Sequence, residues 1–457
     1  MPSRPVGCVT GCAGSDSNAM TPPRPVDLAI SARWIVPVEP QRVLADGVLL
    51  VDDGRIVALA TQEAAARDYA PRESIALERH ALIPGLVNAH THTAMTLLRG
   101  IADDVPLDAW LKDHIWPREA KFVTPEFIHD GVTLGAVEML RGGITCCSDM
   151  YFYPDAAAHA YDAAGLRAVI GLPVLDFPTP YASDADAYLR LGLDARDRFR
   201  HLPRLGWMLA PHAPYTVGDA AFAKIVTYAR QLDLAIQTHL QETRAELDDA
   251  MAKYGESELA RLDRLGATGP GFLAIHAVHL GPGDRELLVR HGCSVAHCPA
   301  SNMKLASGVA PVVDLMSRGV NVALGTDGAA SNNRLDLFSE MRLAALLAKV
   351  SGGDASALPA ATVLRMATLG GAMALSMGDA IGSLEPGKQA DVVAVDMGEI
   401  DDAPVYDPVS HLVHVASRER VTDVWVAGER VVRERTPTRV DVPALAARAR
   451  LWQQRLR

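Results

Sequence analysis

Two histidines one residue apart follow an apolar run in the segment VNAHTHTAMTLLRG, residues 87–100. On a β-strand, residues i and i+2 point to the same side, so His90 and His92 can face one pocket together. Imidazole pairs of this kind suit zinc and similar borderline metals. Histidines also occur as ordinary polar groups at strand ends, so the pair predicts a metal site only if the chain supplies further ligands.

Three residues at the ends of other apolar runs can supply them. His239 ends LAIQTH, His276 ends GFLAIH, and Asp327 ends NVALGTD. Three or four nitrogen and oxygen ligands with one open position form the catalytic pattern of zinc. Each residue alone is better explained as a hydrogen-bonded polar group. The common placement of the whole set nevertheless favours one metal site.

Glu242 is the candidate for proton transfer, because it lies three residues after His239 without being needed as a ligand. A metal lowers the pKa of bound water to ~7. Hydrolysis then needs a carboxyl group that delivers a proton to the substrate. The alternative is that Glu242 is a surface glutamate on a loop. The neighbouring histidine makes this interpretation the weaker one.

The elements that must position these residues alternate between apolar runs and helical patterns over residues 83–385. Such alternation is typical of parallel strands joined by helices, and eight runs predict an α/β fold with a (β/α)8 TIM barrel. A doubly wound open sheet is the alternative. The barrel is favoured because polar residues end nearly every run, on the face where a barrel carries its active site. These residues are His90 and His92, Asp149, Asp176, His212, His239, His276, His297 and Asp327.

The two flanks of this region differ from it and resemble each other. Residues 26–82 and 386–440 contain short apolar runs broken by turn signals, which predict a small β-sandwich domain built from both chain ends. Residues 441–457 are expected to form a C-terminal helix. Residues 1–25 are rich in small and polar residues and are expected to be a disordered extension.

Composition excludes several classes of protein. The chain has 457 residues, a formal net charge of −11 and no long basic run, which argues against a nucleic-acid-binding surface. No apolar run approaches the ~18 residues needed to span a bilayer, so no membrane association is expected. The six cysteines form no C-x-x-C pair, which favours reduced cysteines and a cytoplasmic location.

Five segments resemble the amidohydrolase superfamily: PGLVNAHTHTAMTLLRG, THLQET, HAVH, HCPASNMKL and LGTDGAASNNRLDLFSEMRLAALL. More narrowly they resemble its 5′-methylthioadenosine/S-adenosylhomocysteine deaminase group, which is related to triazine chlorohydrolases. The resemblance covers about residues 27–435. It implies that one divalent metal, usually zinc with iron and manganese as alternatives, is bound by His90, His92, His239 and Asp327.

The resemblance also implies the catalytic roles. Activated water would attack the purine C6, Asp327 would take its proton with help from His276, and ammonia would leave. Glu242 would protonate the purine N1. Relatives with two metals bridge them by a modified lysine at the end of the fourth strand. Here that strand reads MLAPHAP, without a lysine, so one metal is expected.

Substrate contacts come from the same resemblance. Trp110 would pack on the nucleoside, Glu119 would hold the ribose hydroxyls, and His212 and Ser331 would hydrogen-bond the purine, together with Glu242. Relatives that act on S-adenosylhomocysteine carry arginines after the third strand. This chain has only a late arginine there, Arg190. The expected substrates are therefore 5′-methylthioadenosine and adenosine, with S-adenosylhomocysteine left open.

Other functions remain open from the sequence. A deaminase or chlorohydrolase of a free purine base or an s-triazine would share the metal site and differ in the pocket. An amide hydrolase would usually hold two metals, and a non-catalytic scaffold would be expected to have lost ligands. The expected partner is a small purine nucleoside, and relatives imply a homo-oligomer, either a dimer or a tetramer.

Overall fold

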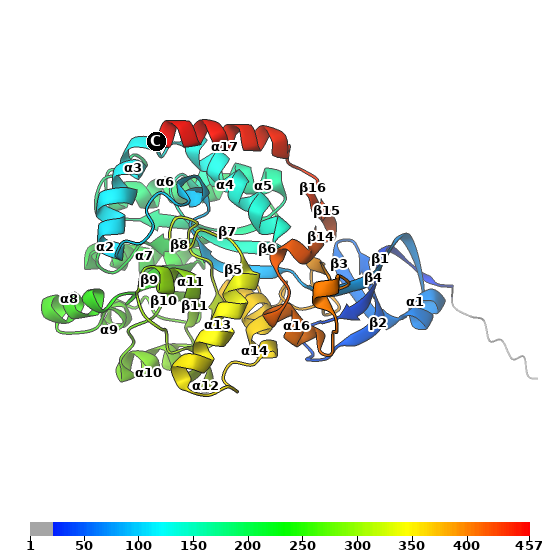
Figure 1. Ribbon diagram of the computed structural model, residues 1–457. Coiled ribbons are helices and arrows are strands. Elements are labelled where there is room, and N and C mark those ends of the chain that lie inside the picture. Colours follow the sequence, from blue (N-terminus) through cyan, green and yellow to red (C-terminus); the bar gives the residue numbers. More distant parts are fainter. Residues whose placement is uncertain (1–21) are drawn as a thin grey trace, which may run out of the picture.

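An eight-stranded parallel barrel forms the centre of the protein, as the computed structural model of residues 22–457 shows (Figure 1). Consecutive strands pair in parallel from the first to the last. The strands are β5 (Leu86–Thr91), β6 (Ile144–Met150), β7 (Arg167–Val174), β8 (Leu205–Pro211), β9 (Ala235–Leu240), β10 (Phe272–His276), β11 (Ser294–His297) and β12 (Asn321–Leu324). The predicted (β/α)8 barrel is confirmed, and the eight predicted apolar runs supply its strands.

The first and last strands meet just beyond β12. The Asp327 amide donates a hydrogen bond to the His90 carbonyl at 3.0 Å, and the Thr326 amide donates to Asn88 Oδ1 at 2.9 Å. This contact closes the barrel where the chemistry-bearing residues lie. Strands β5, β6 and β7 are buried on both faces, which explains why their sequences are continuous apolar runs.

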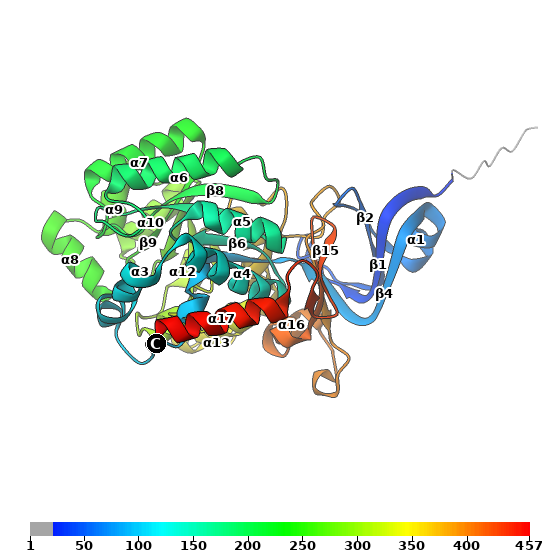
Figure 2. The same ribbon diagram turned by 90° about the horizontal axis from the view of Figure 1, so that it is seen from above.

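Helices surround the barrel strands (Figures 1 and 2). They are α4 (Pro125–Arg141), α5 (Pro154–Ala164), α6 (Ala185–Phe199), α7 (Asp219–Leu232), α8 (Arg244–Tyr254), α9 (Glu258–Arg264), α10 (Pro282–His291), α11 (Pro299–Lys304), α12 (Val312–Ser317), α13 (Leu337–Gly352), α14 (Ala360–Arg365), η3 (Met366–Gly370) and α15 (Gly371–Ala374). Helix α4 begins at a capping threonine, because the Thr124 hydroxyl accepts a hydrogen bond from the Phe127 amide at 3.2 Å.

A helical excursion joins β5 to α4 and contributes to the cavity at the carboxyl ends of the strands. It consists of η1 (Thr93–Leu98), α2 (Leu107–Ala109), the π-helix η2 (Trp110–Ile115) and α3 (Trp116–Phe122). A π-helix is rare and occurs frequently at functional sites. The excursion packs closely on α4, since a Cβ at Gly131 would lie 2.5 Å from the Ala94 carbonyl oxygen.

A second eight-stranded sheet lies beside the barrel and uses both chain ends (Figure 2). Its strands are β1 (Arg24–Ile35), β2 (Leu44–Asp52), β3 (Arg55–Thr61), β4 (Tyr69–Pro84), β13 (Val392–Asp396), β14 (Val421–Val426), β15 (Glu429–Arg433) and β16 (Thr436–Pro437), with α1 (Gln62–Asp68) after β3. The sheet curls, as the hydrogen bond from the Ala390 amide to the Gly54 carbonyl at 2.8 Å shows. The predicted pairing of the two chain ends is therefore present within one curled sheet.

A buried ion pair joins the two sheets at the amino-terminal end of β7. Arg167 Nη2 lies 3.0 Å from Asp391 Oδ1, and both side chains are 1% exposed. Arg167 Nη2 also donates to Gln389 Oε1 at 2.6 Å. This junction lies at the end of the barrel opposite to the carboxyl ends of the strands.

The C-terminal part of the chain returns to the barrel. After η4 (Ile400–Asp402), α16 (Pro408–His414) and η5 (Arg418–Arg420), helix α17 (Val442–Leu456) lies along α4 (Figure 2). Trp452 Nε1 donates a hydrogen bond to Asp130 Oδ2 at 3.0 Å.

Most of the predicted N-terminal extension, residues 1–21, lies outside the described residues, together with Cys8 and Cys12. Strand β1 begins at Arg24, so the last two residues of that segment belong to a strand. Within residues 22–457, no helix has the length and apolar character to cross a bilayer.

Candidate active site

Four donor groups from distant parts of the chain meet at the carboxyl ends of the barrel strands. His90 on β5, His239 on β9, His276 on β10 and Asp327 after β12 place one ligand atom each within 4.8 Å of one another. All four side chains are buried. The structure thus brings together residues up to 237 positions apart in the chain.

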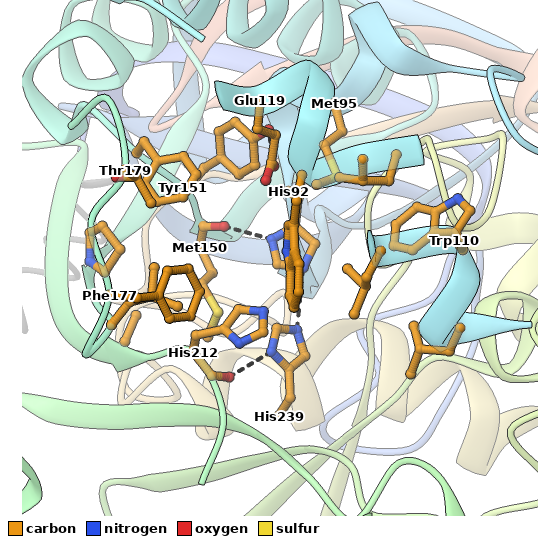
Figure 3. Close-up of a pocket in the computed structure, with 18 of the residues that line it drawn as sticks. His92, Met95, Trp110, Glu119, Met150, Tyr151, Phe177, Thr179, His212 and His239 are labelled. Atoms are coloured by element: carbon orange, nitrogen blue, oxygen red, sulfur yellow. Dashed lines mark hydrogen bonds between the residues drawn. The ribbon is translucent and has the colours of Figure 1, made fainter. Parts of the chain in front are cut away.

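His92 belongs to the same cluster. Its Nε2 lies 3.3 Å from His239 Nε2 and 3.3 Å from Asp327 Oδ1 (Figure 3). Two nitrogens held by zinc at ~2.1 Å in a tetrahedral arrangement stand ~3.4 Å apart. The spacing of the two imidazoles therefore fits a shared metal ion.

The hydrogen bonds of these two rings fix their tautomers. His92 Nδ1 donates to the Met150 carbonyl at 2.6 Å, and His239 Nδ1 donates to the His212 carbonyl at 2.7 Å. A carbonyl oxygen only accepts, so each ring carries a proton on Nδ1, and in the neutral form of both rings the two Nε2 lone pairs face each other. Such an arrangement is repulsive without a cation between the nitrogens. Backbone carbonyls orient metal-binding histidines in this way.

His90 is completely buried, and among the described residues neither of its ring nitrogens has a hydrogen-bond partner. Its Nε2 is 3.5 Å from Asp327 Oδ1. Burial lowers the pKa of His90 to about 4, so the ring is neutral near pH 7 and offers a lone pair. A buried polar atom without a partner is costly, and a cation would satisfy it. The residues present fit a divalent metal.

Asp327 is held from behind by two hydroxyl groups. Ser301 Oγ and Ser331 Oγ each donate to Asp327 Oδ2 at 2.7 Å. Asp327 Oδ1 faces the histidines and also accepts a hydrogen bond from the Gly328 amide at 2.7 Å. Asp327 has a φ of 59°, in the left-handed region that a non-glycine residue rarely adopts. Burial opposes the ionisation of Asp327, but charge on neighbouring histidines, among them His276 with its raised pKa, keeps the pKa of Asp327 well below its usual value.

Ser331, predicted to contact the purine, has its hydroxyl beside Asp327 in this structure. Its hydroxyl is engaged with Asp327 and the Gly328 carbonyl, and its side chain is 2% exposed. It is not among the residues that line the cavity. In this structure Ser331 supports a predicted metal ligand.

His276 and Glu242 form the part of the site suited to proton transfer. His276 Nε2 lies 3.6 Å from Glu242 Oε2, and His276 Nδ1 hydrogen-bonds Asn302 Oδ1 at 2.8 Å. Burial raises the pKa of Glu242, which favours its protonated form. For His276, burial acts to lower the pKa, but the carboxylates of Glu242 and Asp327 outweigh it and the pKa is raised. A carboxyl group that takes up a proton readily is suited to deliver one to a substrate.

A cavity of about 370 Å³ opens above this cluster. Its lining is mostly apolar, with aromatic and aliphatic side chains from the excursion after β5 and from the loop after β7. The lining includes Leu107, Trp110, Leu111, Ile115, Trp116, Phe152, Leu175, Phe177, Pro178 and Pro180. A largely apolar chamber with a few polar groups is the usual form of a small-molecule site.

Three polar groups predicted to contact substrate line this cavity. The buried Trp110 Nε1 has no hydrogen-bond partner in the part of the chain that the structure describes. Glu119 is buried, and Tyr151 OH donates to its Oε1 at 2.6 Å. His212 Nδ1 hydrogen-bonds Thr216 Oγ1 at 3.1 Å, and burial lowers the pKa of His212 to about 3. Its neutral ring can hydrogen-bond a heterocyclic base.

Other residues at strand ends stay outside the cavity. Asp149 Oδ1 accepts a hydrogen bond from the Thr93 amide at 3.0 Å, and Asp176 Oδ2 accepts one from the Gly218 amide at 2.6 Å. His297 is buried and does not line the cavity. Tyr151, Ser301 and Ser307 are residues of the site that sequence reasoning missed. Tyr151 alone had a signal, because it directly follows the apolar run of β6.

Known proteins resemble this chain over nearly its whole length. The sequence model of the Amidohydrolase family matches residues 81–431. A 5-methylthioadenosine/S-adenosylhomocysteine deaminase of Teredinibacter turnerae is 46% identical over 96% of this chain and 99% of that protein. The crystal structure of an adenosine deaminase from Xanthomonas campestris with bound zinc is 48% identical and has a TM-score of 0.94, covering 95% of this chain and 99% of that one.

A more distant likeness concerns the fold. The atrazine chlorohydrolase of Arthrobacter aurescens in complex with zinc has a TM-score of 0.86 at 24% identity, over 93% of this chain and 99% of that chain.

Proposed function

Since the chain belongs to the amidohydrolase family, we propose that it is a metal-dependent hydrolytic deaminase of adenine nucleosides, acting on 5′-methylthioadenosine and adenosine. The observation that carries the proposal is that the predicted metal ligands lie together and that three of them, His92, His239 and Asp327, line one cavity with Glu242. The names of the Teredinibacter and Xanthomonas relatives support an adenine nucleoside as the substrate.

We propose that His90, His92, His239 and Asp327 hold one divalent cation, with zinc expected and iron or manganese as alternatives. When bound, the cation would supply Lewis-acid activation of water at neutral pH. The facing lone pairs of His92 and His239 support this ligand set, as does the unpartnered ring of His90. A single ion is favoured because β8 ends in APH, without a lysine to bridge a second one.

Different residues of the chain then carry out the separate proton transfers. Asp327 Oδ1 accepts the proton of the attacking water, and His276 orients that water. Glu242 delivers a proton to the purine N1 as oxygen adds at C6. The proton taken by Asp327 passes to the amino group, which leaves C6 as ammonia, while Glu242 regains a proton from the added hydroxyl. One water is consumed per nucleoside and a 6-oxopurine is formed. These groups act where charge develops in the transition state, which is where stabilisation raises the rate.

The cavity favours an uncharged 5′ substituent. Among the described residues that line it, none is a lysine or an arginine, and the loop after β7 contributes Phe177, Pro178 and Pro180. A methylthio group buries well against such a surface. The zwitterionic tail of S-adenosylhomocysteine would lose hydration there without gaining a charged partner. We therefore expect 5′-methylthioadenosine to be the better thioether substrate.

Loss of adenine absorbance tests the function directly. The purified protein, with its metal content measured, should be assayed with 5′-methylthioadenosine, adenosine, S-adenosylhomocysteine, guanine and a chlorotriazine. We expect about one metal ion per chain and turnover of the first two compounds. Metal-loaded protein that releases no ammonia from any adenosine analogue would refute the proposal.

The variant Glu119→Gln separates nucleoside from free-base turnover. A carboxylate makes charge-assisted hydrogen bonds to two vicinal hydroxyls, and an amide makes weaker ones. The variant should therefore lose most of its activity on nucleosides and little on a base or triazine. Glu286→Gln on the exposed face of α10 is the matched control.

Two further expectations remain proposals. The cytoplasmic location is supported by the free, buried state of Cys146, Cys147, Cys293 and Cys298. A homo-oligomer, dimer or tetramer, is to be tested by measuring the mass of the protein in solution.

A further inference from the structure

We propose that Tyr151 is a positioning residue for the Glu119 carboxylate and thereby sets the preference of the site for ribonucleosides over 2′-deoxynucleosides. This inference rests on the proposed function, in which Glu119 binds the ribose hydroxyls. Tyr151 directly follows β6, and Glu119 lies on α3. The two side chains line the same cavity, and Figure 3 shows them side by side.

The contact between them is short and buried. Tyr151 OH donates to Glu119 Oε1 at 2.6 Å, with the residues 7% and 8% exposed. Among the described residues, no other side chain or amide donates to the Glu119 carboxylate. Glu119 Oε2 is therefore left for a ligand, while Oε1 is held by the phenol.

A glutamate needs such support in this cavity. Its three rotatable bonds give it many rotamers, and within residues 22–457 only Tyr151 hydrogen-bonds its carboxylate. Burial also raises the pKa of Glu119, whereas the hydrogen bond from Tyr151 favours its ionised form. A charged carboxylate with one oxygen held accepts two vicinal hydroxyls more strongly than a mobile or protonated one.

The tyrosine itself is well fixed. Its ring packs against Phe152 at 5.2 Å between centroids and against His92 at 6.2 Å. The preceding residue, Met150, accepts the hydrogen bond from His92 Nδ1 through its carbonyl. The end of β6 therefore orients both a predicted metal ligand and the ribose-binding carboxylate. Because neighbouring residues of one strand end orient both groups, the distance between the metal site and the ribose-binding carboxylate is set by the backbone of β6.

The test compares adenosine with 2′-deoxyadenosine in wild type, Tyr151→Phe, Glu119→Gln and the double variant. Wild type should prefer adenosine in kcat/KM. Loss of one charge-assisted hydrogen bond should reduce that preference about 10-fold in Tyr151→Phe, mainly through a higher KM for adenosine. Because Tyr151 acts through Glu119, adding Tyr151→Phe to Glu119→Gln should change the preference little further.

The control is Tyr406→Phe, at a residue that is 93% exposed, which should leave both substrates unaffected. Thermal melting shows whether Tyr151→Phe still folds. If Tyr151→Phe loses activity equally on both nucleosides, Tyr151 has only a structural role and the inference is overturned. A preference for adenosine over 2′-deoxyadenosine that equals that of wild type would also overturn it. Additive effects in the double variant would also overturn it, because Tyr151 would then act independently of Glu119. Wild type that deaminates neither nucleoside would defeat the proposed function itself.

Discussion

Ser307 donates a hydrogen bond to Glu242, with 3.0 Å between its hydroxyl oxygen and Glu242 Oε1. The two residues are 65 positions apart and both are buried. The serine fixes the orientation of the carboxyl group that we assign to proton transfer. The His279 ring in turn holds the backbone of Ser307, since its Nε2 donates to the Ser307 carbonyl at 2.7 Å.

Replacing Ser307 by alanine should therefore lower kcat while leaving the metal content unchanged. A hydrogen bond between neutral groups contributes about 0.5–1.5 kcal/mol, so a loss of about 2- to 10-fold is expected. Steady-state kinetics and metal analysis of the same preparation check this. Ser317→Ala, on the exposed end of α12, is the control. Unchanged kcat would show that Glu242 is positioned without Ser307.

Gly325 leaves room for His90. A Cβ at this position would lie 3.0 Å from the His90 amide nitrogen and 3.0 Å from Cys298 Sγ. The added methyl group of Gly325→Ala should displace the strand that carries His90. Such overpacking lowers the free energy of unfolding by about 1–3 kcal/mol. We expect a lower melting temperature and faster loss of metal to a chelator.

The matched substitution is Gly283→Ala in α10, where a Cβ meets nothing within 4 Å. It should leave metal retention unchanged and stabilise the helix by about 0.5–1 kcal/mol. If both variants retain metal equally, the close approach of β12 to His90 does not matter for the site.

The buried Arg167–Asp391 pair should be essential for joining the barrel to the second sheet. Arg167→Met leaves an uncompensated carboxylate at a position that is 1% exposed. Removing one partner of a buried pair typically costs about 3–5 kcal/mol. Denaturant unfolding measures this cost. Arg33→Met breaks the exposed pair with Asp46, which should contribute less than about 1 kcal/mol. A similar small effect at Arg167 would contradict the prediction.

Glu258 should make the protein less stable as the pH rises. Burial raises the pKa of this carboxyl to about 8, against 4.5 for an exposed glutamate. Between those values the folded chain holds a proton that the unfolded chain has released. The free energy of unfolding therefore falls with increasing pH across this window.

Glu258→Gln removes this group from the titration. The variant should lose less stability than wild type between about pH 5 and pH 8, as measured by melting temperature across that range. Glu286→Gln, on the exposed face of α10, should keep the wild-type slope. An unaltered slope in Glu258→Gln would mean that Glu258 is ionised throughout the range.

Much of this architecture could be predicted from sequence because barrel strands are buried on both faces. Their apolar runs, and the polar residues that end them, therefore stand out locally. His90, His239 and Asp327 carry that signal, and the structure brings them together. The residues that orient Asp327 and Glu242 carry no such signal. Ser301 and Ser307 are ordinary hydroxyl residues, and their roles depend on contacts with Asp327 and Glu242 that only the folded chain creates.

Ser331 shows a second limit of sequence reasoning, because its motif predicts a substrate contact and says nothing of its hydrogen bond to Asp327. The turn after β12 directs its hydroxyl back to Asp327. Asp149 and Asp176 share the placement of the predicted metal ligands at strand ends. Their carboxylates instead accept hydrogen bonds from the Thr93 and Gly218 amides. Placement at a strand end therefore locates a residue near the site and does not fix its role.

The contact between the Asp327 amide and the His90 carbonyl has a consequence for the biogenesis of the protein. Under the proposed ligand set, the first two donors are synthesised early and the last more than 230 residues later. A nascent chain that has not yet released residue 327 from the ribosome carries an incomplete set of donors. The cation would then bind late in folding. A protein that retains the cation would be one in which the first and last strands of the barrel have come together.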